Sequence, residues 1–187
     1  MTRYVGFNKI KLSVIKRDID YARKLAKKCE NSLIYGPKGP SSQIRRLLFD
    51  TFSISDMDWD SVDKKVMITK LINRFGDFRK RIDNIICMFP KKPHKGSEQF
   101  AAYWYPKTPN YIYFLPAYFR ITSIKERAAK IIHEFIHMVQ IQPGHPGGLS
   151  SIDNAVVYFE QTSINIQFQQ AFDNPYCYQY FVEWLPD

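Results

Sequence analysis

The sequence predicts an α+β domain that is mostly helical, with a small antiparallel or mixed β-sheet beside one central helix. Several long stretches place apolar residues three and four apart, which is the spacing of amphipathic helices. Short runs rich in isoleucine and aromatic residues lie between them and are typical of strands. The 187 residues have the length of one domain with a substantial core. We therefore expect a single domain over residues 1–187, with a helical N-terminal part (1–82) and a C-terminal part (83–187) that carries the sheet.

The N-terminal part is predicted to hold three helices, at residues 13–33, 42–52 and 61–81. Glycine and proline at residues 36–40 separate the first two helices, and a polar connection at 56–60 precedes the third. Apolar residues are expected to face inward at Ile15, Ile19, Ala22, Leu25, Cys29 and Leu33, then at Ile44, Leu47, Leu48 and Phe52, and finally at Val62, Val66, Leu71, Phe75, Phe78 and Ile82.

Three β segments are predicted next, at residues 84–89, 103–105 and 111–115. The turn at 106–110 contains two prolines and an asparagine, so the second and third segments should form a hairpin. His94 lies in the polar, basic loop 91–97 before this hairpin. We expect its imidazole to be exposed rather than to act as a ligand.

Capping signals mark the helices of the C-terminal part. Ser123 with Glu126 three residues later is a capping box, which should start a helix that ends near the turn-rich loop 142–148. Asp153 is expected to open another helix that extends to about residue 172. Asn174 followed by Pro175 should then start a final helix at 176–184.

The composition restricts the classes of protein to consider. The net charge is +9, but no motif that reads DNA or RNA accompanies it, so we expect a solvated helical surface rather than a specific nucleic-acid site. The three cysteines are far apart and are expected to be buried thiols. No apolar run is long enough to span a bilayer, and residues 1–11 lack the pattern of a secretory signal. The localisation stays open, with export by a signal-independent route as one expectation.

The motif that stands out is H-E-F-I-H at residues 133–137, inside the apolar helix that follows Ser123. On an α-helix, His133 and His137 fall within about 40° of each other and about 6 Å apart along the axis. Both imidazoles can therefore bind one tetrahedral Zn²⁺, and Glu134 can act as general base on a water held there. A buried helix with two incidental histidines would look the same, but this spacing is rare in a chain with only four histidines.

A catalytic zinc site needs a third protein ligand, for which three downstream residues are candidates. His145 lies eight residues after His137, which does not match the six-residue spacing and intervening glycine of metzincins. Asp153 would complete a His-His-Asp site, although it is also a good helix N-cap. Glu160 would give a thermolysin-like site at a somewhat longer spacing. Asp153 and Glu160 lie about 10 Å apart along a helix, so one ion cannot bind both, and spacing alone leaves them equal.

Three stretches of the C-terminal half share a pattern with one family. Residues 103–119 read Y-W-Y-P-K-T-P-N-Y-I-Y-F-L-P-A-Y-F, residues 127–137 hold the histidine motif, and residues 173–181 read D-N-P-Y-C-Y-Q-Y-F. Over residues 101–185 the chain thus resembles the aspzincin metallopeptidases, the group of deuterolysin and peptidyl-Lys metalloendopeptidase. The resemblance implies a zincin-like fold, and it implies Asp153 as the third zinc ligand, since the family uses an aspartate that follows the metal helix.

The chain departs from the aspzincin pattern in two places. The family has a tyrosine three residues after its aspartate ligand, where it polarises the scissile carbonyl, but Val156 stands there in this sequence. Tyr158 is the nearest substitute for that catalytic phenol, but on a regular helix it would lie about 140° around the axis from Asp153. It can serve this role only where the segment departs from a helix, and packing in the core is the alternative. The acidic pair that recognises lysine in Lys-specific members maps onto Tyr176 and Gln179, so a preference for lysine is not expected.

Together, the motif and the resemblance predict a monomeric zinc metalloendopeptidase that acts on protein or peptide substrates. The segment 111–115 is expected to be the edge strand beside the site and to pair with an extended substrate. A secreted toxin or effector is one role that we expect for such a small basic peptidase. A peptidoglycan or other specialised amide hydrolase with the same zinc chemistry is one alternative. A basic module that binds nucleic acid or an anionic surface, with a non-catalytic metal site, is another.

Overall fold

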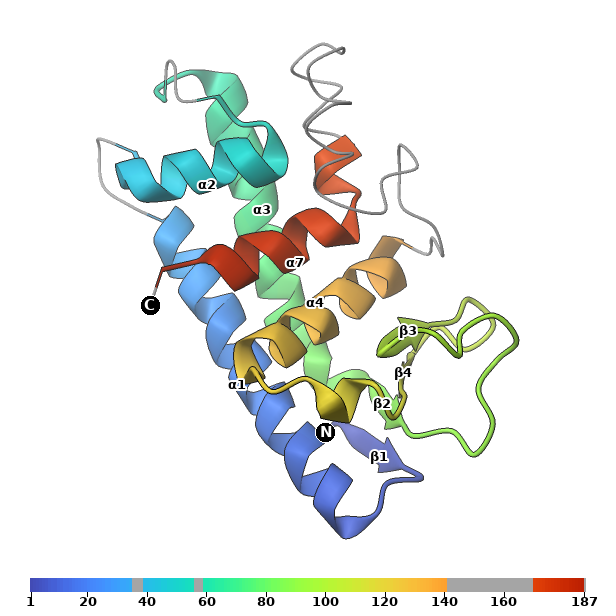
Figure 1. Ribbon diagram of the computed structural model, residues 1–187. Helices are drawn as coiled ribbons and strands as arrows, with labels where there is room; N and C mark the ends of the chain where they lie inside the picture. The colour runs from blue at the N-terminus through green and yellow to red at the C-terminus, as the bar shows by residue number, and fades with distance from the viewer. Residues whose placement is uncertain (35–38, 56–58, 141–169, 187) are drawn as a thin grey trace.

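The computed structural model describes residues 1–34, 39–55, 59–140 and 170–186 (Figure 1). The chain is α+β, as predicted. Its elements are β1 (Arg3–Val5), α1 (Lys9–Leu33), α2 (Ser42–Phe52), α3 (Val62–Arg81), the 3-10 turn η1 (Ile82–Asn84), β2 (Ile86–Met88), β3 (Ala102–Trp104), β4 (Tyr111–Phe114), the 3-10 turn η2 (Tyr118–Arg120), α4 (Ile124–Gln140) and α7 (Pro175–Trp184). In the described part, no helix is both long and apolar enough to cross a membrane.

The sheet is small and mixed, with the strand order β1-β2-β4-β3. β1 pairs with β2 and β2 with β4 in parallel, whereas β3 and β4 form the predicted antiparallel hairpin. The prediction that residues 111–115 form the edge strand is therefore wrong, because β4 lies between β2 and β3. The edge next to α4 is β3 instead. The sequence predicted the hairpin of β3 and β4 but not the strand β1. It therefore gave no reason to expect β2 beside β4, on the side opposite β3.

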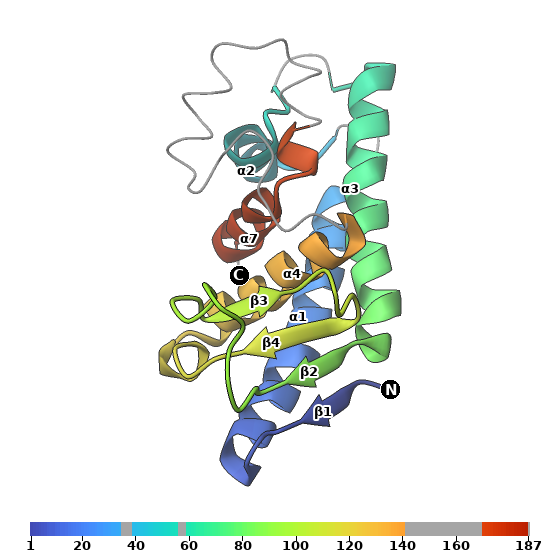
Figure 2. The same ribbon diagram turned by 90° about the vertical axis from the view of Figure 1, so that its right-hand side faces the viewer.

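Helix α4 lies at the centre of the fold. It packs against α1, α7 and β3, and Figure 2 shows the four strands in front of α1 and α4. Most of its residues are buried, including the polar side chains of Arg127, His133, Glu134 and His137. A helix enclosed on so many sides has a fixed position relative to the sheet, which is what a catalytic group on it requires.

Ser123 and Asn174 lie at the starts of helices, as predicted, whereas the start of the helix predicted from Asp153 lies outside the described residues. The Ser123 hydroxyl accepts a hydrogen bond from the Glu126 amide at 3.2 Å, and the Asn174 side chain accepts one from the Tyr176 amide at 3.0 Å. Helix α1 begins four residues earlier than predicted, at Lys9, because Asn8 caps it through the amide of Lys11.

The core confirms most of the predicted inward-facing residues. All those named for α1 and α2 are buried, and the three cysteines are buried free thiols. The prediction is wrong at the start of α3, where Val62 and Val66 are exposed. Met67 and Ile68 are buried instead, so the inward-facing stripe of this helix begins one turn later.

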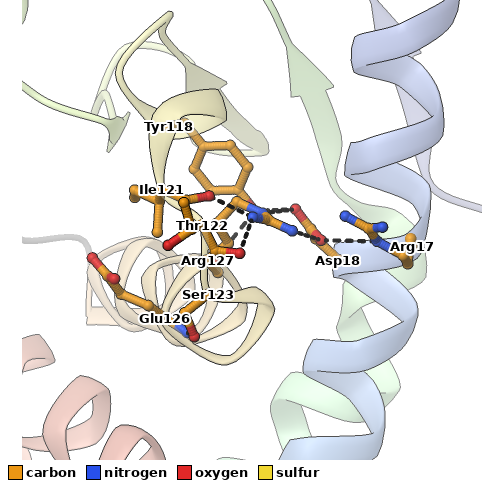
Figure 3. A network of polar contacts seen from close by, with 8 residues as sticks. All are labelled: Arg17, Asp18, Tyr118, Ile121, Thr122, Ser123, Glu126 and Arg127. Carbon is orange, nitrogen blue, oxygen red and sulfur yellow. Dashed lines mark hydrogen bonds and ion pairs between the residues drawn. The ribbon is translucent and has the colours of Figure 1, made fainter.

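A buried ion pair joins α1 to α4 (Figure 3). The Arg127 guanidinium donates to both carboxylate oxygens of Asp18, at 2.7 and 3.1 Å, and also to the carbonyl of Ile121. The Tyr118 hydroxyl donates to the same carboxylate at 3.1 Å. Asp18 is fully buried and Arg127 is 5% exposed, so neither charge is compensated by bulk water.

We expect Asp18→Asn to lower the free energy of unfolding by about 3–5 kcal/mol, because it leaves the Arg127 guanidinium buried without its counter-charge. Urea unfolding followed by circular dichroism measures the loss. The matched control is Asp20→Asn on the same helix, where the carboxylate pairs with Arg23 but is 66% exposed. An exposed pair of this kind contributes about 0–1 kcal/mol. Equal losses in the two variants would contradict a structural role for the buried pair.

Candidate active site

The two histidines of the motif lie on successive turns of α4 and are brought together as predicted. Their ring centroids are 4.9 Å apart, and each residue is 6% exposed. The residues between and behind them, such as Phe135 and Ile136, are buried in the core and prevent α4 from rotating. The imidazoles therefore share one side of a helix whose orientation is set by packing.

The two histidines open into a cavity of about 470 Å³. Among the described residues, three parts of the chain line it: α4, the segment that runs from the loop before β3 into β3, and the first turns of α7. The lining residues on α4 are Lys130, His133, Glu134 and His137, those on α7 are Tyr176 and Gln179, and those on the third wall include His94, Tyr103, Trp104 and Tyr105.

Glu134 is a buried carboxyl group in this cavity, 7% exposed. Burial raises its pKa to about 8, while a hydrogen bond from the backbone amide of Trp104 and the charge of Lys130 act in the opposite direction. A cation bound nearby would lower the pKa further, because it favours the charged form of the carboxyl group. The Trp104 amide thus acts on the carboxyl group from the side of β3.

The free edge of β3 faces this site. Leu115 donates a backbone hydrogen bond to the carbonyl of Ala101, and Tyr103 pairs with Tyr113 in the antiparallel ladder. Along an antiparallel strand, successive residues direct their backbone N–H and C=O groups alternately toward and away from the partner strand. Those of Ala102 and Trp104 therefore point away from β4. The hydrogen bond from the Trp104 amide to Glu134 agrees with that direction.

Helix α7 contributes Tyr176 and Gln179, the two positions that the aspzincin resemblance aligned with substrate recognition. The Tyr176 ring lies edge-on to that of His133, with centroids 4.6 Å apart. Burial raises the pKa of Tyr176, and so does the neighbouring charge of Glu134. Gln179 donates to the Glu183 carboxylate at 3.0 Å, which fixes the orientation of its amide.

His94 is half-buried and not exposed, so that prediction is wrong. Its ring stacks on Tyr105 with centroids 4.1 Å apart, and its Nδ1 lies 2.9 Å from the Tyr103 hydroxyl. The same hydroxyl accepts from the His94 backbone amide at 3.3 Å. The signal in the sequence was the alternation of tyrosines at 103, 105, 111 and 113, which places their rings on one face of the hairpin.

Asp153, Tyr158, Glu160 and His145 lie outside the described residues. Among the residues that are described, no group of three potential ligands surrounds a common point. The donors that are present nonetheless suit zinc: two buried imidazoles on one helical face, open to a cavity that also holds a carboxylate. They would provide two of the three protein ligands of a catalytic site.

Comparison with known proteins adds no relative. The sequence matches no protein-family model, and no curated protein matches it. The residues of the cleft themselves therefore carry the functional interpretation.

We expect Tyr103→Phe to loosen the loop at residues 91–101, because it removes the hydroxyl that contacts the backbone amide and the Nδ1 atom of His94. Loss of such hydrogen bonds costs about 1–2 kcal/mol, so amide exchange in this loop should accelerate by about five- to 30-fold. Hydrogen-exchange mass spectrometry measures it. Tyr111→Phe is the control, since the Tyr111 hydroxyl makes no hydrogen bond within the described part of the chain. Equal exchange in the two variants would refute the contact.

Proposed function

We propose that the chain is a zinc-dependent metalloendopeptidase with a zincin-like domain. The observation that carries this proposal is the convergence of His133, Glu134 and His137 on one side of α4, in an open cleft beside the edge strand β3. Burial of three polar side chains on a helix is costly, and it is expected where they act together.

His133 and His137 would hold the zinc ion, together with Asp153, which the aspzincin resemblance suggests, or Glu160. Bound zinc would supply the Lewis acidity that makes a water nucleophilic near neutral pH. Imidazoles bind metal in their neutral form through a ring nitrogen, and these two rings lie 4.9 Å apart, centroid to centroid, on one side of α4.

Glu134 would act as the general base. Its carboxylate would take a proton from the attacking water and pass it to the leaving amine, a transfer for which its environment is suited. Burial raises the pKa of Glu134 and a bound cation would lower it, so the group would be able to accept and release a proton near neutral pH. Tyr158 is the residue that we propose to stabilise the oxyanion, in place of the tyrosine that the aspzincin pattern has three residues after its aspartate.

An extended peptide would bind along β3. The backbone groups of Ala102 and the carbonyl of Trp104, which are directed away from β4, can pair with a substrate strand, as in β-augmentation. Such pairing would carry a peptide bond past the face of α4 that bears the histidines, because β3 packs against that helix.

Glu134→Gln should retain one zinc per chain and lower the rate of casein cleavage at least about 100-fold, since the proton acceptor is lost while both histidines stay. Elemental analysis and a fluorescent casein assay measure the two quantities. Glu126→Gln, on the first turn of the same helix and outside the cleft, is the matched control and should act like the wild type. Cleavage by Glu134→Gln at the wild-type rate would refute the mechanism.

Asp153→Ala and Glu160→Ala should differ in zinc affinity. We expect the Asp153 variant to bind zinc at least about 100-fold more weakly, because loss of a direct ligand should exceed the loss seen for outer-shell partners. Competition with a fluorescent chelator measures both affinities. Loss of affinity in the Glu160 variant alone would make Glu160 the ligand. Unchanged zinc affinity in both variants would show that neither carboxylate is a zinc ligand.

A further inference from the structure

Lys130 lies on the same side of α4 as the proposed catalytic residues. At about 100° per residue, Lys130, His133, Glu134 and His137 fall within about 100° of one another around the helix axis. All four line the same cavity. Lys130 is half-buried and precedes Glu134 by one helical turn, so the two residues are neighbours on the side of α4 that lines the cavity.

This lysine is not committed to an ion pair with another described residue. The carboxylates whose charges reach it are Glu134 and Glu183. Glu134 receives the Trp104 amide, and Glu183 accepts the Gln179 side chain at 3.0 Å. Elsewhere on the surface, lysines and arginines do pair, as Lys27 does with Glu30 and Arg46 with Asp50. The charge of a half-buried lysine that lines a cleft is screened less by water than the charge of an exposed one.

The described walls of the cleft favour an anionic ligand. Lys95 and Lys130 are the cations that line it, and among the described lining residues Glu134 is the only carboxylic acid. The α7 wall contributes Tyr176 and Gln179, which are polar but uncharged at neutral pH. The net charge of +9 over the whole chain would steer acidic segments toward such a site.

We propose that Lys130 binds the side-chain carboxylate of an aspartate or glutamate next to the scissile bond, so that acidic peptides are the preferred substrate class. This inference rests on the proposed peptidase function and assigns its specificity. Lys95, exposed on the loop before β3, would add attraction at the rim of the cleft. The carboxylate would be bound by charge and by one to three N–H donors of the ammonium group.

A peptide library tests the proposal with the zinc-loaded full chain. Cleavage sites should be enriched in Asp or Glu at one position adjoining the cut. A matched pair of peptides with Glu or Gln at that position should then differ in kcat/KM by about ten- to 100-fold, the range for a hydrogen bond to a charged group. Raising the salt concentration should reduce this ratio, because salt screens the attraction.

Variants of Lys130 assign the preference to this residue. Lys130→Met should bring the Glu-to-Gln ratio close to one, Lys130→Arg should preserve most of it, and Lys130→Glu should shift cleavage toward Lys or Arg. Lys107→Met is the matched control, because Lys107 is exposed on the turn between β3 and β4 and does not line the cavity. Its Glu-to-Gln ratio should equal that of the wild type.

The outcomes separate this inference from the proposed function. Peptide cleavage without an acidic preference, or with a preference that Lys130→Met leaves intact, would overturn the role of Lys130 and leave the peptidase function standing. No cleavage of any library peptide by the zinc-loaded chain would overturn both.

Discussion

The ion pair between Arg127 and Asp18 is the constraint on which the geometry of the cleft depends. Arg127 lies near the start of α4, and its guanidinium is held by α1 and by carbonyls of the preceding segment. Seven residues later, Glu134 falls within about 20° of it around the helix axis. The pair therefore fixes the rotation of the whole stripe of cleft residues. A slip of α4 by one residue would move this stripe by about 100° and bury the imidazoles against the core.

The same helix has to satisfy two opposing demands. The side of α4 that faces the cleft carries a lysine, two histidines and a glutamate. The other sides are mainly apolar, and their burial fixes the position of the helix. Each of those polar groups is partly removed from water, which costs stability unless a partner compensates for it. The Trp104 amide compensates part of the cost for Glu134. Positions that break the pattern of a core helix in this way are expected where a site has been selected for function.

Local features of the fold were predictable from sequence, and arrangements between distant segments were not. Ser123 and Asn174 predicted the starts of α4 and α7, because a helix cap is a contact between residues that are close in the chain. The spacing of His133 and His137 fixed their proximity for the same reason. The strand β1 has only three residues and carries no alternating apolar pattern, and its pairing with β2 spans about eighty residues of chain. Its presence, and with it the interior position of β4, depended on contacts that no local pattern records.

The cleft shows why a motif alone underdetermines a site. H-E-x-x-H specifies which side of one helix could bind metal, but the other walls come from β3 and α7, which meet α4 only through tertiary packing. Lys130 has the appearance of an ordinary helical surface lysine in the sequence, one of 27 basic residues. In the fold, Lys130 becomes a candidate ligand-binding residue, because β3 and α7 enclose the space in front of it. One helical turn thus determines which chemistry the H-E-x-x-H motif makes available. The charges that the rest of the fold places around that turn determine which ligand the site can accept.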